Sequence, residues 1–226
     1  MSSILCDSSS LITLVDSCYL DMFYYLNRKY KIDFIIPPYV REEIIEKPLS
    51  IKMRAYELSA LRMKEAINDN VFIEVDAQTK EETDDLLKIA NNIFFVRGKP
   101  IHLIDKGETD MLVLASKLNI DTLLIDERTT RLLIEAPFKL KEHLEKELNV
   151  NVMMDKKNYD KFKELVKGMK IIRSVEILLL SYELGYFNNI NIDKRNIVNA
   201  SLYKLKYNGC AISFDEIEQI IHHELK

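Results

Sequence analysis

Short apolar runs alternate with longer amphipathic segments through the first two thirds of the chain. The runs predict buried strands at residues 3–6, 32–36, 71–75 and 122–125, and a further strand at 150–153. Apolar residues at helical spacing predict helices over 11–29, from 40 onward, and over 51–68, 81–92, 108–118, 128–134 and 140–148. Strands that alternate with helices indicate crossover connections, so the predicted fold class is α/β, a three-layer α/β/α sandwich around a mostly parallel sheet.

The pattern changes near residue 154. No strand pattern follows, and the apolar spacing predicts only helices, at residues 160–166, 171–184, 193–207 and 213–225. Ser213 and Glu216 have the spacing of a capping box for the final helix, and Gly185 stands where glycine commonly ends a helix. Two domains are therefore predicted, an α/β core of residues 1–153 and a helical carboxyl-terminal appendage of residues 154–226.

The composition is that of an ordinary globular protein. Of the 226 residues, 47% are hydrophobic and 30% are charged. No apolar run has the roughly 18 residues that a membrane-spanning helix requires. The three cysteines, Cys6, Cys18 and Cys210, are far apart and form no CxxC pair, which argues against a zinc site or a disulfide framework. We therefore expect a protein of the reducing cytoplasm without a membrane span.

The formal net charge of −4 does not match a nonspecific nucleic-acid binder, which is usually basic. Residues 154–226 contain 12 Lys and Arg against 10 Asp and Glu, so the excess of acid lies in residues 1–153. A protein of this charge needs local cations or a bound metal to attract phosphate. Arg97, Lys99 and Lys106, in or beside a predicted loop at 96–106, are candidates, although a solvated loop is the simpler interpretation.

Acidic residues stand at or near the ends of several predicted strands. In open α/β sheets, ligands bind beyond the carboxyl ends of the strands, so acids at these positions are candidates for one common site. The candidates are Asp7 after the first strand, Glu42 and Glu43 about one helical turn after the second, Glu108 and Asp110 at the start of the helix before the fourth, and Asp126 after the fourth.

Carboxylates that share one site repel each other and are costly unless a cation neutralises them. Oxygen ligands without thiol or imidazole suit Mg²⁺ or Mn²⁺, and none of the four histidines stands beside an acid at a strand end. Each acid alone also has a structural interpretation, as a helix cap for Asp7 and Asp126, or as a solvated or first-turn helix residue for the others. Their joint placement favours a metal site.

Four segments, in the same order, resemble the motifs of PIN domains, a family of metal-dependent nucleases. They are CDSSSLI (6–12), IIPPYVREEI (35–44), KGETDMLVLA (106–115) and LLIDERTTRLL (123–133). The resemblance covers roughly residues 3–135, and the tail from about 165 to 221 looks like the helical extension of one archaeal and bacterial branch. It implies a PIN-like sandwich that hydrolyses phosphodiester bonds with Mg²⁺ or Mn²⁺.

The resemblance implies site residues position by position. Asp7 matches the first acid of the family and Asp126 matches the fourth. Glu43 matches the second acid better than Glu42, because it directly precedes the apolar Ile44. Asp7, Glu43 and Asp126 are therefore expected to be catalytic residues and metal ligands.

The third acid is open between Glu108 and Asp110. The two side chains point about 200° apart on a helix, so they cannot share a face. Asp110 is favoured as a metal ligand by its spacing to the alanine of the motif, whereas Glu108 keeps the Gly-Glu pair of the motif variant and is the competing catalytic residue. Glu127, next to Asp126, is expected to face solvent.

The implied reaction is metal-assisted attack of water on a phosphodiester bond, which needs no 2′-hydroxyl. Single-stranded RNA is the expected substrate, DNA is chemically allowed, and the products carry a 5′-phosphate. An antitoxin-like protein partner and a homodimer are compatible with the resemblance.

The alternative is a catalytically weak PIN-fold module that binds nucleic acid or another protein. A response-regulator-like phosphatase fits less well, because no paired acids follow the first strand. Aromatic residues of the appendage, such as Tyr207, are expected to pack in a core rather than to stack on bases.

Overall fold

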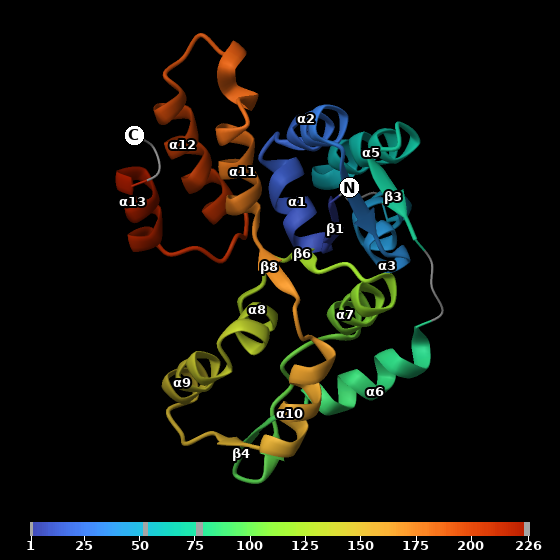
Figure 1. The fold of residues 1–226 in the computed structure, drawn as a ribbon, viewed down its shortest axis with the longest axis vertical. Helices are drawn as coiled ribbons and strands as arrows, with labels where there is room; N and C mark the ends of the chain where they lie inside the picture. The colour runs from blue at the N-terminus through green and yellow to red at the C-terminus, as the bar shows by residue number, and fades with distance from the viewer. Residues whose placement is uncertain (1, 52–53, 76–78, 224–226) are drawn as a thin grey trace. The chain divides into compact units, whose positions relative to one another are not determined.

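The structure, a computed structural model, describes residues 2–51, 54–75 and 79–223 (Figure 1). The chain forms two compact units, each built from segments that are far apart in the sequence. The first unit comprises Met1–Val75, Leu124–Asp126 and Ile172–Lys226, and the second comprises Asp76–Leu123 and Glu127–Ile171. None of the described helices combines the length and the apolar character that crossing a membrane requires.

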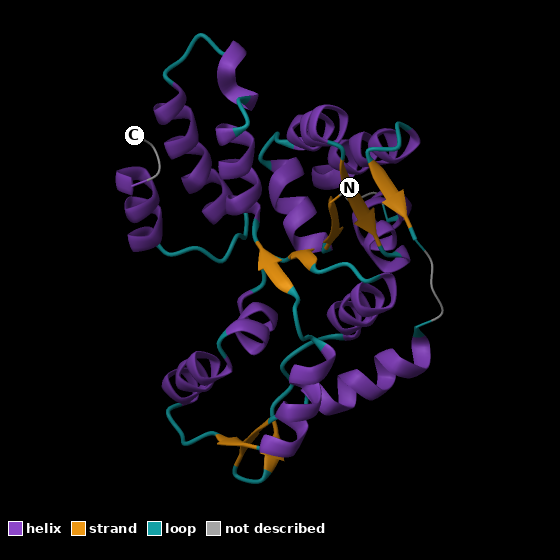
Figure 2. Ribbon diagram, in the orientation of Figure 1, coloured by secondary structure: helices purple, strands orange, loops and turns teal. Residues whose placement is uncertain are grey.

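A five-stranded sheet has the strand order β3–β2–β1–β6–β8 (Figure 2). Its strands are β1 (Ser2–Cys6), β2 (Ile32–Ile36), β3 (Phe72–Glu74), β6 (Thr122–Leu124) and β8 (Lys170–Ile172). Strand β2 is parallel to both β1 and β3, with Phe34 opposite Ile4 on one side and Phe72 on the other. The Asp7 N–H donates to the Leu124 carbonyl at 3.0 Å and so connects β1 to β6. The predicted α/β class with a central parallel sheet flanked by helices is confirmed.

The central strands are buried because nearly every residue in them is apolar, as strands of a parallel sheet require. Successive side chains alternate between the two faces, so Ile4 and Phe34 belong to the main core of the first unit, while Leu5 points to the opposite face and is also buried. At the centre of this core, the ring centroid of Phe23 lies 4.8 Å from that of Phe34 and 5.0 Å from that of Phe72.

The helices of the first unit come from both ends of the chain. They are α1 (Ser8–Asp16), α2 (Leu20–Tyr30), α3 (Pro38–Arg41), α4 (Lys47–Ser50), α5 (Arg54–Asn68), α11 (Ser174–Glu183), α12 (Lys194–Tyr207) and α13 (Phe214–His223), with a short 3-10 helix η2 (Tyr186–Asn189). The hydroxyls of Tyr25 and Tyr30 on α2 both donate to the Leu184 carbonyl after α11, at 2.6 and 2.8 Å. Of the predicted helices 51–68 and 213–225, residues 52, 53, 224 and 225 lie outside the described residues.

The contacts group the chain differently from the predicted division between residues 153 and 154. Residues 172–226 share the core of the first 75 residues, and Val175, Leu202 and Ile217 are fully buried in it. The prediction that only helices follow residue 154 is wrong, because β8 is an edge strand of the parallel sheet. Its three residues are too short an apolar run to indicate a strand in the sequence.

The second unit combines helices with a small antiparallel sheet. The helices are α6 (Lys80–Ala90), α7 (Lys106–Leu118), α8 (Arg128–Glu135), α9 (Pro137–Leu148) and α10 (Lys156–Leu165). The sheet has the order β5–β4–β7, with β4 (Phe94–Val96), β5 (Lys99–Pro100) and β7 (Met153–Met154). The strand predicted at 150–153 is therefore displaced and pairs with β4 rather than in the parallel sheet.

The segment predicted as a loop at 96–106 is in part a β-hairpin. Val96 pairs with Lys99, and the two residues between them, Arg97 and Gly98, have φ angles of +50° and +79°. A two-residue hairpin of this type needs positive φ at both central positions, and Gly98 adopts one without a steric penalty. The prediction of a loop is wrong for Val96, Lys99 and Pro100, which are in strands, whereas it holds for the turn and for residues 101–105, which have no regular structure.

Candidate active site

Asp7 follows β1 and caps α1. Its Oδ2 accepts hydrogen bonds from the Ser9 N–H, at 3.1 Å, and from the Ser9 hydroxyl. Only 6% of the residue is exposed. Burial raises the pKa of Asp7 above its ordinary value, the bonds from Ser9 oppose this shift, and the charge of Glu43 adds to it. Asp7 is therefore a helix cap, and it is also a buried carboxylate whose ionised form a nearby cation would stabilise.

Glu43 lies on a π-helical turn, η1 (Glu42–Glu46), between α3 and α4. At the end of this turn the Lys47 N–H donates to the Glu42 carbonyl, five residues earlier. The next residue, Pro48, has no N–H with which to continue an α-helical pattern, which explains the wide turn at this point.

The contacts of the two adjacent glutamates separate their roles. The Ser8 hydroxyl donates to Glu43 Oε2 at 2.6 Å, which ties Glu43 to the residue after Asp7. Lys47 Nζ lies 3.7 Å from a carboxylate oxygen of Glu42 and 3.8 Å from one of Glu43, so this lysine does not distinguish them. The bond from Ser8 favours Glu43 over Glu42 as the acid that lies beside Asp7.

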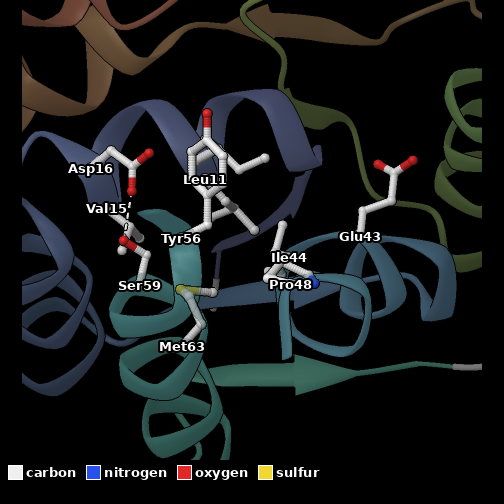
Figure 3. Close-up of a pocket in the computed structure, with 10 residues that line it drawn as sticks. Leu11, Val15, Asp16, Glu43, Ile44, Pro48, Tyr56, Ser59 and Met63 are labelled. Carbon is white, nitrogen blue, oxygen red and sulfur yellow. Dashed lines mark hydrogen bonds between the residues drawn. The ribbon is translucent and has the colours of Figure 1, made fainter. Parts of the chain in front are cut away.

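A pocket of about 180 Å³ lies beside Glu43, between α1, η1 and α5 (Figure 3). Its walls are mainly apolar and include Leu11, Ile44 and Met63. On one side the Ser59 hydroxyl donates to Asp16 Oδ1 at 2.6 Å. Among the described residues, those that line this pocket include no lysine or arginine.

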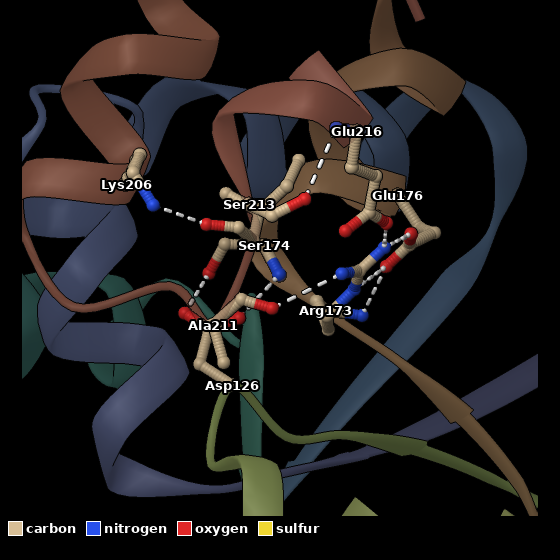
Figure 4. A network of polar contacts seen from close by, with 9 residues as sticks. Asp126, Arg173, Ser174, Glu176, Lys206, Ala211, Ser213 and Glu216 are labelled. Atoms are coloured by element: carbon tan, nitrogen blue, oxygen red, sulfur yellow. Dashed lines mark hydrogen bonds and ion pairs between the residues drawn. The ribbon is translucent and has the colours of Figure 1, made fainter. Parts of the chain in front are cut away.

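Asp126 is the second residue after β6 and is 1% exposed. Each of its carboxylate oxygens accepts a hydrogen bond from Ser174, at the start of α11 (Figure 4), and the Cys210 thiol is a further hydrogen-bond partner of this carboxylate. The Ser174 N–H donates to Oδ1 at 2.7 Å, and the Ser174 hydroxyl donates to Oδ2 at 2.6 Å. Burial raises the pKa of the nearby Cys210 thiol, and the charge of Asp126 adds to this shift.

The short helix α8 is capped by Glu127 and not by Asp126. Glu127 accepts hydrogen bonds from the N–H groups of Thr129, at 2.7 Å, and Thr130, at 2.6 Å. Glu127 is half-buried, so it faces solvent only in part, and it is the cap because the first turn of α8 needs an acceptor and Asp126 is bonded to Ser174 instead. Asp126 thus accepts from the first residue of α11, whereas the helix that follows it in sequence, α8, is capped by Glu127.

Three of the predicted acids belong to the first unit and gather near one edge of the parallel sheet. Asp7 and Asp126 follow the carboxyl ends of neighbouring strands, since the Asp7 N–H bonds to Leu124 in β6. Glu43 reaches the same end of β1 through Ser8. The structure therefore brings Asp7 and Glu43 together and places Asp126 on the adjacent strand.

Glu108 and Asp110 belong to the second unit, on the first turns of α7. Glu108 forms a capping box in which its Oε2 accepts from the Asp105 N–H at 2.8 Å, and its Oε1 accepts from the Thr130 hydroxyl at 2.8 Å. Asp110 uses only Oδ1 in the bonds from the hydroxyls of Thr79 and Thr83. Both acids thus have structural partners within the second unit.

The donor set decides which cation these residues could hold. Within the part of the chain that the structure describes, no group of three or more His, Cys, Asp and Glu is arranged to hold a metal ion. The acids of the first unit offer only carboxylate oxygens, which suit Mg²⁺ or Mn²⁺ rather than zinc. The buried carboxylate of Asp7 fits a cation chemically, because neutralisation removes the cost of its burial.

The other predicted binding residues have mixed outcomes. Lys106 Nζ forms an ion pair with Asp84 at 3.3 Å, so its charge is partly compensated. Phe187 is buried in the core of the first unit, as predicted for the aromatic residues of the appendage. Tyr207 is 74% exposed, so the prediction of core packing is wrong for this residue.

Sequence patterns did not identify three serines that hold the acids in place. Ser8 and Ser9 belong to the CDSSSLI segment, whose pattern gave no sign that their hydroxyls bind Glu43 and Asp7. Ser174 lies 48 residues after Asp126, and no motif connects the two positions. Only the folded chain identifies Ser174 as the partner of Asp126.

Comparison with known proteins found no match: no family model, no curated protein and no solved structure matches the chain. The functional conclusion therefore depends on the residues and geometry of the site itself.

Proposed function

We propose that the chain is a PIN-type nuclease that uses Mg²⁺ or Mn²⁺ to hydrolyse phosphodiester bonds, with single-stranded RNA as its substrate. The observation that carries the proposal is the placement of Asp7 and Asp126 at the carboxyl ends of adjacent strands, with Glu43 bonded to Ser8 beside Asp7. Ligands of open α/β sheets bind at this edge.

The side chains of the first unit have distinct roles in this reaction. Asp7 and Asp126 supply anionic oxygens that would hold the cation, and Glu43, which is exposed, orients the attacking water. The metal, when bound, activates water, orients the phosphate and stabilises the leaving oxygen. The assignment of Asp110 or Glu108 as the third acid stays a prediction.

Cleavage of end-labelled single-stranded RNA in Mn²⁺ tests the proposal. Asp7→Asn should lower the cleavage rate by about 100-fold or more, because stabilisation by a bound metal is worth several kcal/mol. Asp16→Asn is the matched control, since Asp16 is an acid on the same helix that binds Ser59 away from Asp7. Equal rates for Asp7→Asn and the wild type would refute the assignment, and single-stranded DNA in parallel reactions identifies the preferred substrate.

The second candidate is a catalytically weak PIN-fold module that binds nucleic acid or another protein. It is favoured by the structural bonds that Asp126 already makes, since each of its carboxylate oxygens accepts a hydrogen bond from Ser174. The two candidates differ in their response to Mn²⁺. A nuclease should gain thermal stability on binding Mn²⁺, whereas the binding module should show no such gain.

A further inference from the structure

Asp126 is held from several directions by the carboxyl-terminal part of the chain (Figure 4). Ser174 binds both of its carboxylate oxygens, and the Ala211 N–H donates to its backbone carbonyl at 3.3 Å. The Ser174 hydroxyl also lies 3.3 Å from the Ser10 carbonyl, but a hydroxyl donates one hydrogen, and the 2.6 Å contact with Asp126 is the shorter one.

Ser174 is itself fixed in place by its neighbour Arg173. The Arg173 guanidinium is almost fully buried, and its Nη2 lies 2.6 Å from a carboxylate oxygen of Glu176 and 2.6 Å from one of Glu216. Its Nη1 donates to the Ala211 carbonyl at 3.1 Å. Arg173 therefore connects the start of α11 to the segment that holds the Asp126 backbone, so the Ser174 hydroxyl has a fixed position.

We propose that Ser174 is a positioning residue that orients the Asp126 carboxylate for a divalent cation, an inference that rests on the proposed nuclease function. A carboxylate has about four lone-pair positions; Ser174 occupies one on each oxygen, and the Cys210 thiol is a third hydrogen-bond partner. The remaining positions are thereby oriented. Partners that hold metal-ligating side chains in this way typically change metal affinity by about 10- to 100-fold when they are removed.

The competing explanation is that the Asp126–Ser174 contact only caps α11. A cap contributes to folding stability but does not affect the affinity for the metal. Only the positioning role therefore predicts that loss of the Ser174 hydroxyl raises the Mn²⁺ concentration needed for binding and for half-maximal cleavage. Ser181 provides a matched control, because it is a fully buried serine of α11 whose hydroxyl binds the Ile177 carbonyl at 2.8 Å.

The experiment compares the full-length wild type, Ser174→Ala and Ser181→Ala. The Mn²⁺ concentration for half-maximal RNA cleavage and the Mn²⁺ dissociation constant from calorimetry without RNA are measured, with Tm as the record of folding. Ser174→Ala should raise both Mn²⁺ constants by about 10-fold, whereas Ser181→Ala should leave both within about twofold. Ser174→Cys, which replaces one oxygen by sulfur and keeps only a weak donor, serves where Ser174→Ala does not fold and should raise the constants in the same direction.

The outcomes separate this inference from the function on which it rests. A wild type that cleaves RNA, with Mn²⁺ constants that Ser174→Ala and Ser174→Cys leave unchanged, overturns the positioning role and leaves the nuclease standing. Equal shifts in Ser174→Ala and Ser181→Ala also overturn it, because they reflect general loosening of α11. A wild type that neither cleaves RNA nor binds Mn²⁺ refutes the proposed function and the inference together.

Discussion

Asp7→Asn is expected to make the fold more stable, although it removes a proposed metal ligand. Asp7 is buried, and burial raises its pKa, so its ionised form is costly in the folded state. An asparagine of the same shape can accept both bonds that Ser9 donates, and its amide can face the Tyr39 hydroxyl, which lies 3.5 Å from Asp7 Oδ1. The substitution therefore removes a buried charge and keeps the helix cap.

The sign of the pH dependence follows from the raised pKa. A group whose pKa is higher in the folded state contributes stability below its unfolded pKa, and this contribution is lost as pH rises through the folded pKa. The free energy of unfolding of the wild type should therefore fall with rising pH relative to that of Asp7→Asn, whose side chain does not titrate. Single stabilising substitutions commonly raise the free energy of unfolding by about 0.5–2 kcal/mol. We expect about 1 kcal/mol at neutral pH, which corresponds to about 2–4 °C in Tm for a chain of this size.

Thermal unfolding in EDTA, from about pH 4 to about pH 8, measures this difference. The two proteins should converge at the acidic end, and Asp7→Asn should unfold at the higher temperature at neutral pH. Added Mn²⁺ should raise the Tm of the wild type more than that of the variant. An Asp7→Asn protein that is less stable than the wild type at every pH would show that Asp7 acts only as an ordinary cap and that its buried charge is not costly.

Two further substitutions test the core and the anchor of the carboxyl-terminal helices. Phe34→Ala should lower the free energy of unfolding by about 3–5 kcal/mol, because its ring is fully buried against Phe23. The control is Phe138→Ala, at a residue that is 66% exposed, which should change the free energy of unfolding by less than about 0.5 kcal/mol. Urea denaturation measures both values, and equal effects of the two substitutions would contradict the described core. Arg173→Met should cost about 1–3 kcal/mol, because it leaves the partly exposed Glu176 without its cation. An unchanged urea midpoint for Arg173→Met would show that this ion pair does not stabilise the fold.

The parallel sheet could be predicted from the sequence because its central strands are continuous apolar runs. Predicted strands at 3–6, 32–36, 71–75 and 122–125 correspond to β1, β2, β3 and β6. Strand β8 was missed because its residues, Lys170–Ile172, are too few to form a recognisable pattern. The hairpin at Arg97 and Gly98 was missed because its strands are short and its turn contains one glycine among ordinary loop residues.

The candidate site was predictable only as far as local sequence determines it. Asp7 follows an apolar strand and precedes a helix, so both its position and its capping role could be inferred from the residues beside it. The partner of Asp126 could not, because Ser174 reaches it through folding of a distant segment onto the sheet. The bond between Glu108 and Thr130, 22 residues away, likewise depends on folding, whereas the capping box of Glu108 with Asp105 is a local pattern.

Anomalous scattering from crystals soaked in Mn²⁺ shows directly whether the acids of the first unit bind a metal. We expect a Mn²⁺ peak at the carboxyl ends of β1 and β6, with carboxylate oxygens of Asp7 and Asp126 at about 2.0–2.3 Å from the ion. Asp7→Asn crystals should lose this peak. A wild-type crystal whose Mn²⁺ peaks all lie away from Asp7 and Asp126, at a concentration that supports RNA cleavage, would contradict the proposed metal centre.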